Sequence, residues 1–533
     1  MLAKQTASRQ AGAGLILLSF AALALVIYLP CLDGDFIADD YLHIAGPGEA
    51  PELFACWLEP FFRVPGSGEA QYYRPLTLFA YGAVTRLLGP NPVPFHLLNI
   101  CLHSLNAWLL ALIAIGRLGS RRGGAAVGLI FLLHPLQVEE VAYISGLGGL
   151  GACACCLGAI WAWSNRPGRQ VLPAALMAVG LLWKESPLIL PVLLSLAPEA
   201  GERSRRERIT PLVLLWAVAA AYLLGREIFL PQLSLLRPET SPLLPRLGAS
   251  SAGLVTTLRL LFFPTGLHFY RTIPVGWSTL SWLGALAGGA LLVAAISGRR
   301  KPGIGLGIFW FLAAMLPFSG LRPLYLQRDA VFWGEHFSYF ALGGGGLAAA
   351  GTLRFLLDRK GWRRTLPPAT AAIAACLGLL TLQQASLWSS ETAVARSAVR
   401  GEPDLFRVRG FLAEALDREG RCLEAAAQYG LARRLLARHA DGIAEEEYAP
   451  FAAAHLRLYL IGSGLNLGRA GDLLGAALAG AELMRLFPDD PAGNFLLERA
   501  RAGGLKLPPA GQGGTGPAWE LLRGKMRQEP GGR

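Results

Sequence analysis

Charged residues are scarce in this chain of 533 residues: Asp, Glu, Lys and Arg together make up 16% of it. Soluble globular domains carry about 25%, so the scarcity excludes an ordinary soluble enzyme. Hydrophobic residues make up 53% of the chain, and long apolar windows recur along its first 390 residues. Windows of about 17 to 25 residues are long enough to cross the hydrocarbon core of a bilayer. The composition therefore predicts an all-α, multi-pass membrane protein.

Cysteine is also sparse, and the eight residues form no metal-binding or redox pattern. Cys153, Cys155 and Cys156 stand together in an apolar stretch, which favours a role as small packing residues. Cys31 and Cys56 fall in one predicted loop and could form a disulfide if that loop faces an oxidising compartment.

The net charge of +12 does not indicate a nucleic-acid partner, because its distribution is typical of a membrane protein. Residues 388–533 are nearly neutral, with 19 Lys and Arg against 18 Asp and Glu. The basic excess lies in short loops between the apolar windows, as the positive-inside rule expects of cytoplasmic loops. The sequence thus predicts a cytoplasmic N-terminus, an uncleaved first helix, and a C-terminal region on the outer side.

This topology predicts about eleven membrane crossings, and we expect segment 251–267 to be re-entrant or interfacial. The predicted crossings are 12–30, 92–116, 123–135, 142–163, 171–183, 187–197, 210–229, 280–297, 303–319, 337–357 and 365–387.

The motif "FIADDY" at 36–41 places Asp39 and Asp40 where the first apolar run leaves the membrane. Two alternatives are solvated acids beside a helix and a cap for the next helix. The aromatic residues Phe36 and Tyr41 on either side indicate instead that the pair lies at the membrane interface. Ionisable residues at such depths are costly and usually functional, so both are candidate catalytic bases.

A second outer segment, "QYYRPLTLF" at 71–79, carries Arg74 next to Tyr73, which is a candidate for the lining of an outer cavity. A fixed guanidinium at headgroup depth suits a phosphate. "WKES" adds Lys184 as a second candidate for phosphate binding, with Glu185 beside it in the predicted cavity. The alternative for Lys184 and Glu185 is mutual neutralisation or snorkelling to the interface.

Other polar residues gather at the predicted outer ends of apolar runs. His96, on one helical face with Asn99, His103 and Asn106, is a further candidate for phosphate binding, whereas His103 and Asn106 are expected to form hydrogen bonds between helices. The remaining cavity candidates come from "HPLQVEE" and "WGEHFSYF", where a helix cap is the alternative for the second motif; they are His134, Glu139, Glu140, Glu335 and His336.

The C-terminal region contains two similar stretches, 412–436 and 463–491, which align Gly420 with Gly471. Small residues at the turn and at the helix crossing resemble a tetratricopeptide repeat. Plain Ala- and Leu-rich helical hairpins are the alternative. We expect a membrane domain over 1–390 with a first outer loop at 31–91, a repeat-like helical domain over 391–507, and a flexible tail over 508–533.

Taken in order, these motifs resemble the transmembrane-and-tetratricopeptide-repeat O-mannosyltransferase family and its bacterial relatives in the GT-C superfamily. The resemblance implies a glycosyltransferase that uses a polyprenyl-phosphate sugar, with mannose or another hexose as the sugar. It implies that Asp39 or Asp40 is the catalytic base, and that Tyr72–Pro75 and the Lys184–Glu185 pair match conserved family segments. The chain departs from the family at Leu147–Gly149, where a charged pair is usual, and at His336 and Phe337, where Arg and Tyr are usual.

The resulting prediction is a glycosyltransferase of a bacterial inner membrane that acts with inversion on an acceptor hydroxyl. The acceptor, a protein Ser/Thr or a glycan, would bind the repeat-like domain, and membrane lipids would surround the rest. No protein metal site is evident, although a divalent ion at the phosphate stays open. The alternatives are a non-catalytic scaffold and a lipid-linked-sugar flippase; a transporter would show repeated halves, and the sequence has none.

Overall fold

The structure is a computed structural model. It describes residues 2–44, 55–57, 62–63, 70–165, 168–196, 204–229, 242–316, 325–327, 330–357, 359–440 and 448–507. The predicted tail at 508–533 and parts of the first outer loop lie outside the described residues.

The fold is all-α, as predicted, and it divides into two compact units at the junction of Glu391 and Thr392. The helices of the first unit are α1 (Leu2–Ile27), α2 (Asp40–His43), α3 (Pro75–Leu88), α4 (Pro92–Leu118), α5 (Arg121–Leu132), α6 (Val138–Ala142), α7 (Leu147–Asn165), α8 (Leu172–Trp183), α9 (Leu190–Leu196), α10 (Arg205–Phe229), α11 (Leu243–Phe262), α12 (Thr279–Ser297), α13 (Ile304–Met315), α14 (Tyr339–Leu356) and α15 (Arg359–Leu387).

Local sequence signals explain where these helices begin and end. Asn91 caps α4 by accepting a hydrogen bond from Val93 N, and Pro92 occupies the first turn, where its missing N–H costs nothing. The helix ends at Gly119, whose φ of 59° is the left-handed conformation that suits glycine. Ser120 then caps α5 through Gly123 N. One tight turn thus joins two antiparallel helices.

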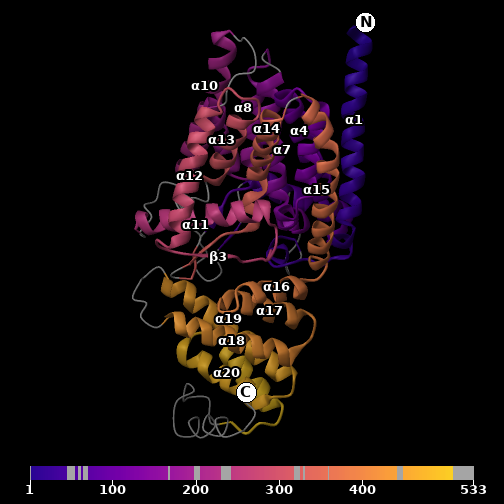
Figure 1. Ribbon diagram of the computed structural model, residues 1–533. Helices are drawn as coiled ribbons and strands as arrows, with labels where there is room; N and C mark the ends of the chain where they lie inside the picture. Colours follow the sequence, from indigo (N-terminus) through magenta and orange to yellow (C-terminus); the bar gives the residue numbers. More distant parts are fainter. Residues whose placement is uncertain are drawn as a thin grey trace. The chain divides into compact units, whose positions relative to one another are not determined.

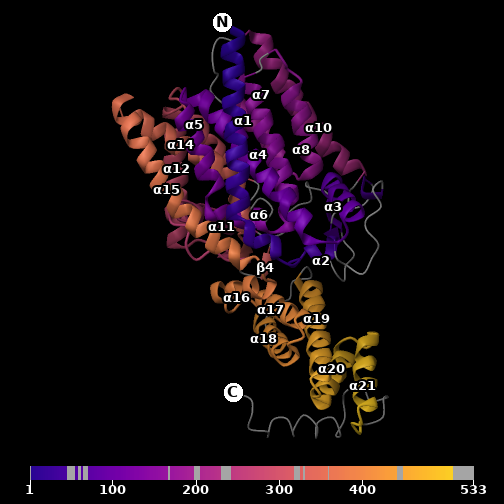
Figure 2. The same cartoon turned by 90° about the vertical axis from the view of Figure 1, so that its right-hand side faces the viewer.

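The first unit has a buried centre and an apolar periphery. Of the membrane-length segment around α7, 72% is buried, against 17% for α10 and for α12. Figures 1 and 2 show α4 and α7 inside the group of helices, with α1, α10, α12 and α15 around them. Exposed Leu286, Val293 and Trp282 cover the outside of α12, a surface that suits lipid rather than water.

Each predicted crossing coincides with a helix, but these helices differ in length. Among the described residues five helical segments are long and apolar enough to cross a membrane, or six if the bent pair 121–132 and 135–142 counts as one. The segments at 12–27, 172–183, 186–196 and 304–315 are apolar but short. At 1.5 Å per residue a 12-residue helix spans only about 18 Å of a core about 30 Å thick.

The segment expected to be re-entrant or interfacial forms the C-terminal part of α11 and the coil after it. Figure 1 shows α11 running crosswise to α12. Strands are few and short in the described chain: β1 (Phe62–Arg63) pairs antiparallel with β2 (Ala70–Tyr72), β3 (Thr272–Pro274) pairs antiparallel with β5 (Ala330–Phe332), and β4 is Tyr325–Gln327.

The second unit is a series of helices in which each one from α17 to α21 packs on the next. Gly420 and Gly471 both adopt positive φ, 73° and 86°, at the turns that begin α18 and α20. The aligned Ala425 and Ala476 are buried. The two stretches are therefore helical hairpins, and their assignment as tetratricopeptide repeats stays a prediction. The helices are α16 (Glu391–Gly401), α17 (Phe406–Arg418), α18 (Cys422–Ala440), α19 (Tyr448–Arg469), α20 (Leu473–Leu486) and α21 (Pro491–Ala502).

Cys31 and Cys56 are buried thiols that are not joined to each other, so the open disulfide prediction is wrong. Cys31 Sγ instead donates to the carbonyl oxygen of Ala385.

The crossing of α11 and α12 depends on the absence of a side chain at Gly284, and this predicts a mutation effect. A Cβ there would lie 1.8 Å from the carbonyl oxygen of Ser251, so the helices must separate. Gly284→Ala should destabilise the unit by about 1–3 kcal/mol and lower its thermal midpoint in detergent. Gly289→Ala on the same helix, where a Cβ meets nothing within 4 Å, is the control; equal midpoints for both variants would contradict the packing argument.

Candidate active site

The acid couplet, Asp39 and Asp40, has one member buried and the other exposed. Asp40 is 1% exposed; its Oδ2 accepts from Ile37 N at 3.0 Å, and its Oδ1 accepts from Ser145 N at 2.8 Å and from Ser145 Oγ. Asp39 is exposed, and its backbone N–H donates to the Tyr143 hydroxyl at 3.1 Å. Asp39 is the N-cap residue of α2, but its side chain makes no capping hydrogen bond. The capping alternative is therefore wrong.

Burial raises the pKa of Asp40 to about 7, although the hydrogen bonds from Ser145 and Ile37 act in the opposite direction. The charge of Asp39 adds to the increase. A carboxyl group that is enclosed and fully bonded in this way fixes the loop, while the neighbouring carboxylate remains accessible.

Arg74 is bound to the loop after α8. Its Nε and Nη2 donate to Glu185 Oε2 at 3.2 and 3.1 Å, and the other oxygen of Glu185 accepts from Arg226 Nη1 at 3.3 Å. Burial would raise the pKa of Glu185, but the two guanidinium groups hold it below its usual value. The Arg74 guanidinium also lies 4.4 Å from the centre of the Tyr72 ring. One carboxylate thus holds two arginines from distant parts of the chain.

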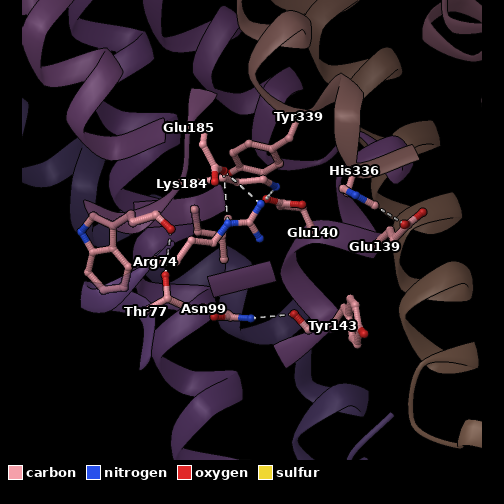
Figure 3. A network of polar contacts seen from close by, with 12 residues as sticks. Arg74, Thr77, Asn99, Glu139, Glu140, Tyr143, Lys184, Glu185, His336 and Tyr339 are labelled. Atoms are coloured by element: carbon pink, nitrogen blue, oxygen red, sulfur yellow. Dashed lines mark hydrogen bonds and ion pairs between the residues drawn. The ribbon is translucent and has the colours of Figure 1, made fainter. Parts of the chain in front are cut away.

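Lys184 pairs with Glu140, whose Oε1 lies 3.8 Å from Nζ. The predicted neutralisation between Lys184 and Glu185 does not occur, because each pairs with a different partner. The Glu140 carboxylate fills the space next to Gly149, where a Cβ would lie 1.5 Å from Oε1 and 3.2 Å from Lys184 Nζ. Figure 3 shows this pair beside Arg74 and Glu185.

A second group of ion pairs begins at the neighbouring residue. Glu139 Oε1 makes a short contact with His336 Nδ1, and its Oε2 accepts from Glu335 N at 3.2 Å. Glu335 Oε1 accepts from Arg271 Nη2 and from His268 N, both at 2.9 Å. The helix-cap alternative for Glu335 is therefore wrong, since its side chain binds the 268–271 segment.

The two groups adjoin each other, because Glu140 of the first and Glu139 of the second are consecutive residues. Burial lowers the pKa of His336 to about 4, and the charges that act on it in addition are those of Glu140, Lys184, Arg74 and Asp39. These four groups come from four separate segments of the chain. Figure 3 shows His336 and Glu139 next to the Glu140 side chain. Ion pairs thus join residues that are distant in the sequence, namely Arg74 with Glu185, Lys184 with Glu140, and His336 with Glu139.

Three predicted candidates are not joined to this network by any contact that we describe. His134 has both ring nitrogens on backbone groups, Leu136 N and Leu261 O. Tyr73 donates to the carbonyl oxygen of Trp57. His96 is 1% exposed, and neither of its ring nitrogens has a hydrogen-bond partner among the described residues.

His103 and Asn106 connect helices, in agreement with the alternative favoured for them. His103 Nδ1 lies 2.7 Å from the Tyr339 hydroxyl, and Asn106 Nδ2 donates to the same oxygen at 3.2 Å. In the part of the chain that the structure describes, no three His, Cys, Asp or Glu side chains come together as a metal site.

Sequence reasoning missed four residues of the site: Arg226, Ser145, Arg271 and His268. Arg226 lies near the end of an apolar run and is 6% exposed. A lone charge inside a predicted span was a signal that could have identified it. Ser145 had no such signal, because a serine in a turn is common and only the fold brings it to Asp40.

With this geometry established, comparison with known proteins gives partial matches to one family. The chain is 34% identical over 176 residues to "Protein O-mannosyl-transferase Tmtc1" of Drosophila melanogaster, a match that covers 31% of the chain and 20% of that protein. It is 34% identical over 164 residues to "Protein O-mannosyl-transferase TMTC1" of Homo sapiens, covering 28% of the chain and 18% of the relative. Mouse "Protein O-mannosyl-transferase TMTC2" is 32% identical over 139 residues.

The predicted resemblance to this O-mannosyltransferase family is confirmed. The matched region spans about a fifth of the length of these relatives. No protein-family model and no solved structure matches the chain.

The raised pKa of Asp40 predicts a pH dependence of stability. An unfolded aspartate has a pKa of about 3.9, so the Asp40 carboxyl group binds its proton more tightly in the folded state than in the unfolded state. Its contribution to stability is full below about pH 4 and is lost as the pH rises through about 7. The thermal midpoint of the wild type, relative to Asp40→Asn, should therefore fall from pH 4 to pH 7 in detergent. Parallel midpoint profiles would show that Asp40 has an ordinary pKa.

Proposed function

We propose that the protein is a membrane glycosyltransferase that transfers a hexose, with mannose first among the candidates, from a polyprenyl-phosphate donor to a Ser or Thr hydroxyl of a protein. The printed names of the relatives support protein O-mannosyl transfer. The observation that carries the proposal is the exposed carboxylate of Asp39, whose charge acts on the His336 imidazole together with those of Arg74 and Lys184.

Asp39 acts as the general base. Its carboxylate takes the proton of the acceptor hydroxyl while the oxygen attacks the anomeric carbon. The new C–O bond forms on the face opposite the phosphate, the bond from the anomeric carbon to the phosphate oxygen breaks, and the sugar inverts. Asp40 does not contact the acceptor; its three hydrogen bonds fix the turn that presents Asp39.

Arg74 and Lys184 stabilise the phosphate that leaves. The phosphodiester of the donor has one negative charge, and the departing phosphate monoester has more, so nearby cations favour the transition state over the ground state. Arg74 is 16% exposed and Lys184 20%, which leaves part of each side chain accessible to a ligand. His96 is a weaker candidate for this contact, since it shares no described hydrogen bond with them.

The departures from the family have a structural counterpart. At Gly149, where the family has a charged residue nearby, the Glu140 carboxylate and the Lys184 ammonium fill the space that a side chain would need. Charge from two other segments thus takes the place of the missing pair. His336 stands where the family has an arginine, and its partner is Glu139.

The donor and the site would meet at the outer leaflet of a bacterial inner membrane, with the N-terminus in the cytoplasm. The C-terminal helical unit would hold the acceptor outside. This orientation follows from the basic loops and from the headgroup depth at which a lipid-linked phosphate lies.

Removal of the base should abolish transfer. In the purified full chain, Asp39→Asn should lower the release of polyprenyl phosphate from polyprenyl-phosphate mannose, in the presence of Ser- and Thr-containing peptides, by about 100-fold or more. Asp35→Asn, an exposed acid of the same loop, should keep wild-type activity. Wild-type activity in Asp39→Asn would refute the proposed mechanism. Movement of the lipid-linked sugar across the vesicle membrane, without any transfer of the sugar to peptide, would favour the flippase alternative.

Arg74 should act on donor binding and on the departing phosphate together. Arg74→Lys retains one charge but loses the two-point contact with Glu185, so kcat/KM for the donor should fall about 10- to 100-fold. Arg86→Ala, an exposed arginine of the same helix, should match the wild type. Unchanged donor kinetics in Arg74→Lys would remove Arg74 from the phosphate site.

A further inference from the structure

The turn that presents Asp39 is held by three consecutive backbone amides. Ile37 N donates to Asp40 Oδ2 at 3.0 Å, Ala38 N to Glu391 Oε1 at 3.0 Å, and Asp39 N to the Tyr143 hydroxyl at 3.1 Å. Each acceptor is a side chain. Two of these acceptors lie more than 100 residues away in the sequence, and Glu391 is the most distant.

Ala38 at the centre of this turn is strained. Its φ is 47°, and it is one of two non-glycine residues with positive φ among those that the structure describes. A Cβ makes the left-handed region unfavourable, so such a residue persists only when surrounding contacts hold it. The amide of Ala38 donates to Glu391, and its carbonyl oxygen accepts a hydrogen bond from Tyr41 N at 3.2 Å, within the same turn.

Glu391 is itself well placed to hold the turn. It is 7% exposed and follows directly on a short segment that runs along the 31–38 loop. Cys31 Sγ donates to Ala385 O, a Cβ at Gly34 would lie 3.1 Å from Trp388 O, and Ala38 N reaches Glu391. The contacts advance in step along both segments, so residues 31–38 and 385–391 lie side by side as far as the Glu391 carboxylate.

Trp388 connects the 385–391 segment to Tyr143. Their ring centres are 5.8 Å apart, and both side chains are buried. Tyr143 in turn accepts the Asp39 amide. The hydrogen bonds of the Ala38 and Asp39 amides therefore both depend on the segment that leads into the C-terminal unit.

We propose that Glu391 is a positioning residue for the candidate base: its carboxylate holds Ala38 in the left-handed conformation and thereby directs Asp39 to the acceptor hydroxyl. The inference rests on the proposed function of Asp39. It assigns a role in the reaction to the residue at the junction of the two units, far in sequence from the other site residues.

The test uses the full chain with polyprenyl-phosphate mannose and Ser- and Thr-containing peptides. Glu391→Ala should lower kcat about tenfold or more, the effect of one hydrogen bond to a charged group, with the donor KM within about twofold because Arg74 is untouched. Glu391→Gln keeps an acceptor oxygen, so its kcat should fall less than that of Glu391→Ala. Asp35→Ala, which removes an exposed carboxylate of the same loop, is the matched control.

Glycine at position 38 separates positioning from a general structural effect. Glycine adopts positive φ without penalty, so Ala38→Gly combined with Glu391→Ala should regain most of the lost kcat, with the Ala38→Gly single variant as the reference. Hydrogen exchange at the amides of residues 37–39 should be faster in Glu391→Ala and slower again in the double variant.

The outcomes are distinct. Inactive Asp39→Asn with fully active Glu391→Ala overturns the inference and leaves the proposed function standing. Active Asp39→Asn overturns the proposed function itself. Loss of kcat without rescue by glycine, or unchanged amide exchange in Glu391→Ala, means that Glu391 does not act through the turn and also overturns the inference. If Glu391→Ala does not fold, Glu391→Gln is judged by the same three measurements.

Discussion

Charges within an apolar group of helices are stable only when they hold one another, and this constraint organises the site. Glu185 lies between Arg74 and Arg226, one carboxylate oxygen to each, while Lys184 meets Glu140. Removal of one partner from such a set leaves an uncompensated charge, at a cost of about 3–5 kcal/mol when buried. The same pairing that makes these charges tolerable brings four segments of the chain to one place.

The packing of small residues makes the pairing possible. Gly149 leaves room for the Glu140 carboxylate, and Gly146 lies against the Glu140 backbone, where a Cβ would be 2.1 Å from the carbonyl oxygen. Both stand at the start of α7, the most buried membrane-length segment of the described chain. Charge at the start of α7 thus comes from Glu140 and Lys184, which lie outside this helix.

Much of the fold was predictable because apolar length and helix caps are local. All eleven predicted stretches coincide with helices, and Asn91, Gly119 and Ser120 mark their boundaries through short-range hydrogen bonds and backbone conformation. Helix length was less predictable, because basic loops indicate sides of the membrane but not where each helix ends. For the site, residue types at the outer ends of apolar runs identified Arg74, Lys184 and the acid couplet as candidates.

The sequence by itself determined that the chain is helical and membrane-embedded, which residues stand at the ends of its apolar runs, and which family it resembles, since composition, periodicity and motif order are properties of the linear chain. Only the tertiary structure decided that Asp40 is buried and Asp39 exposed, that Lys184 pairs with Glu140, and that Glu391 reaches Ala38. The physical reason is that burial and ion pairing depend on which distant segments pack together, and two adjacent aspartates are equivalent until a fold encloses one of them.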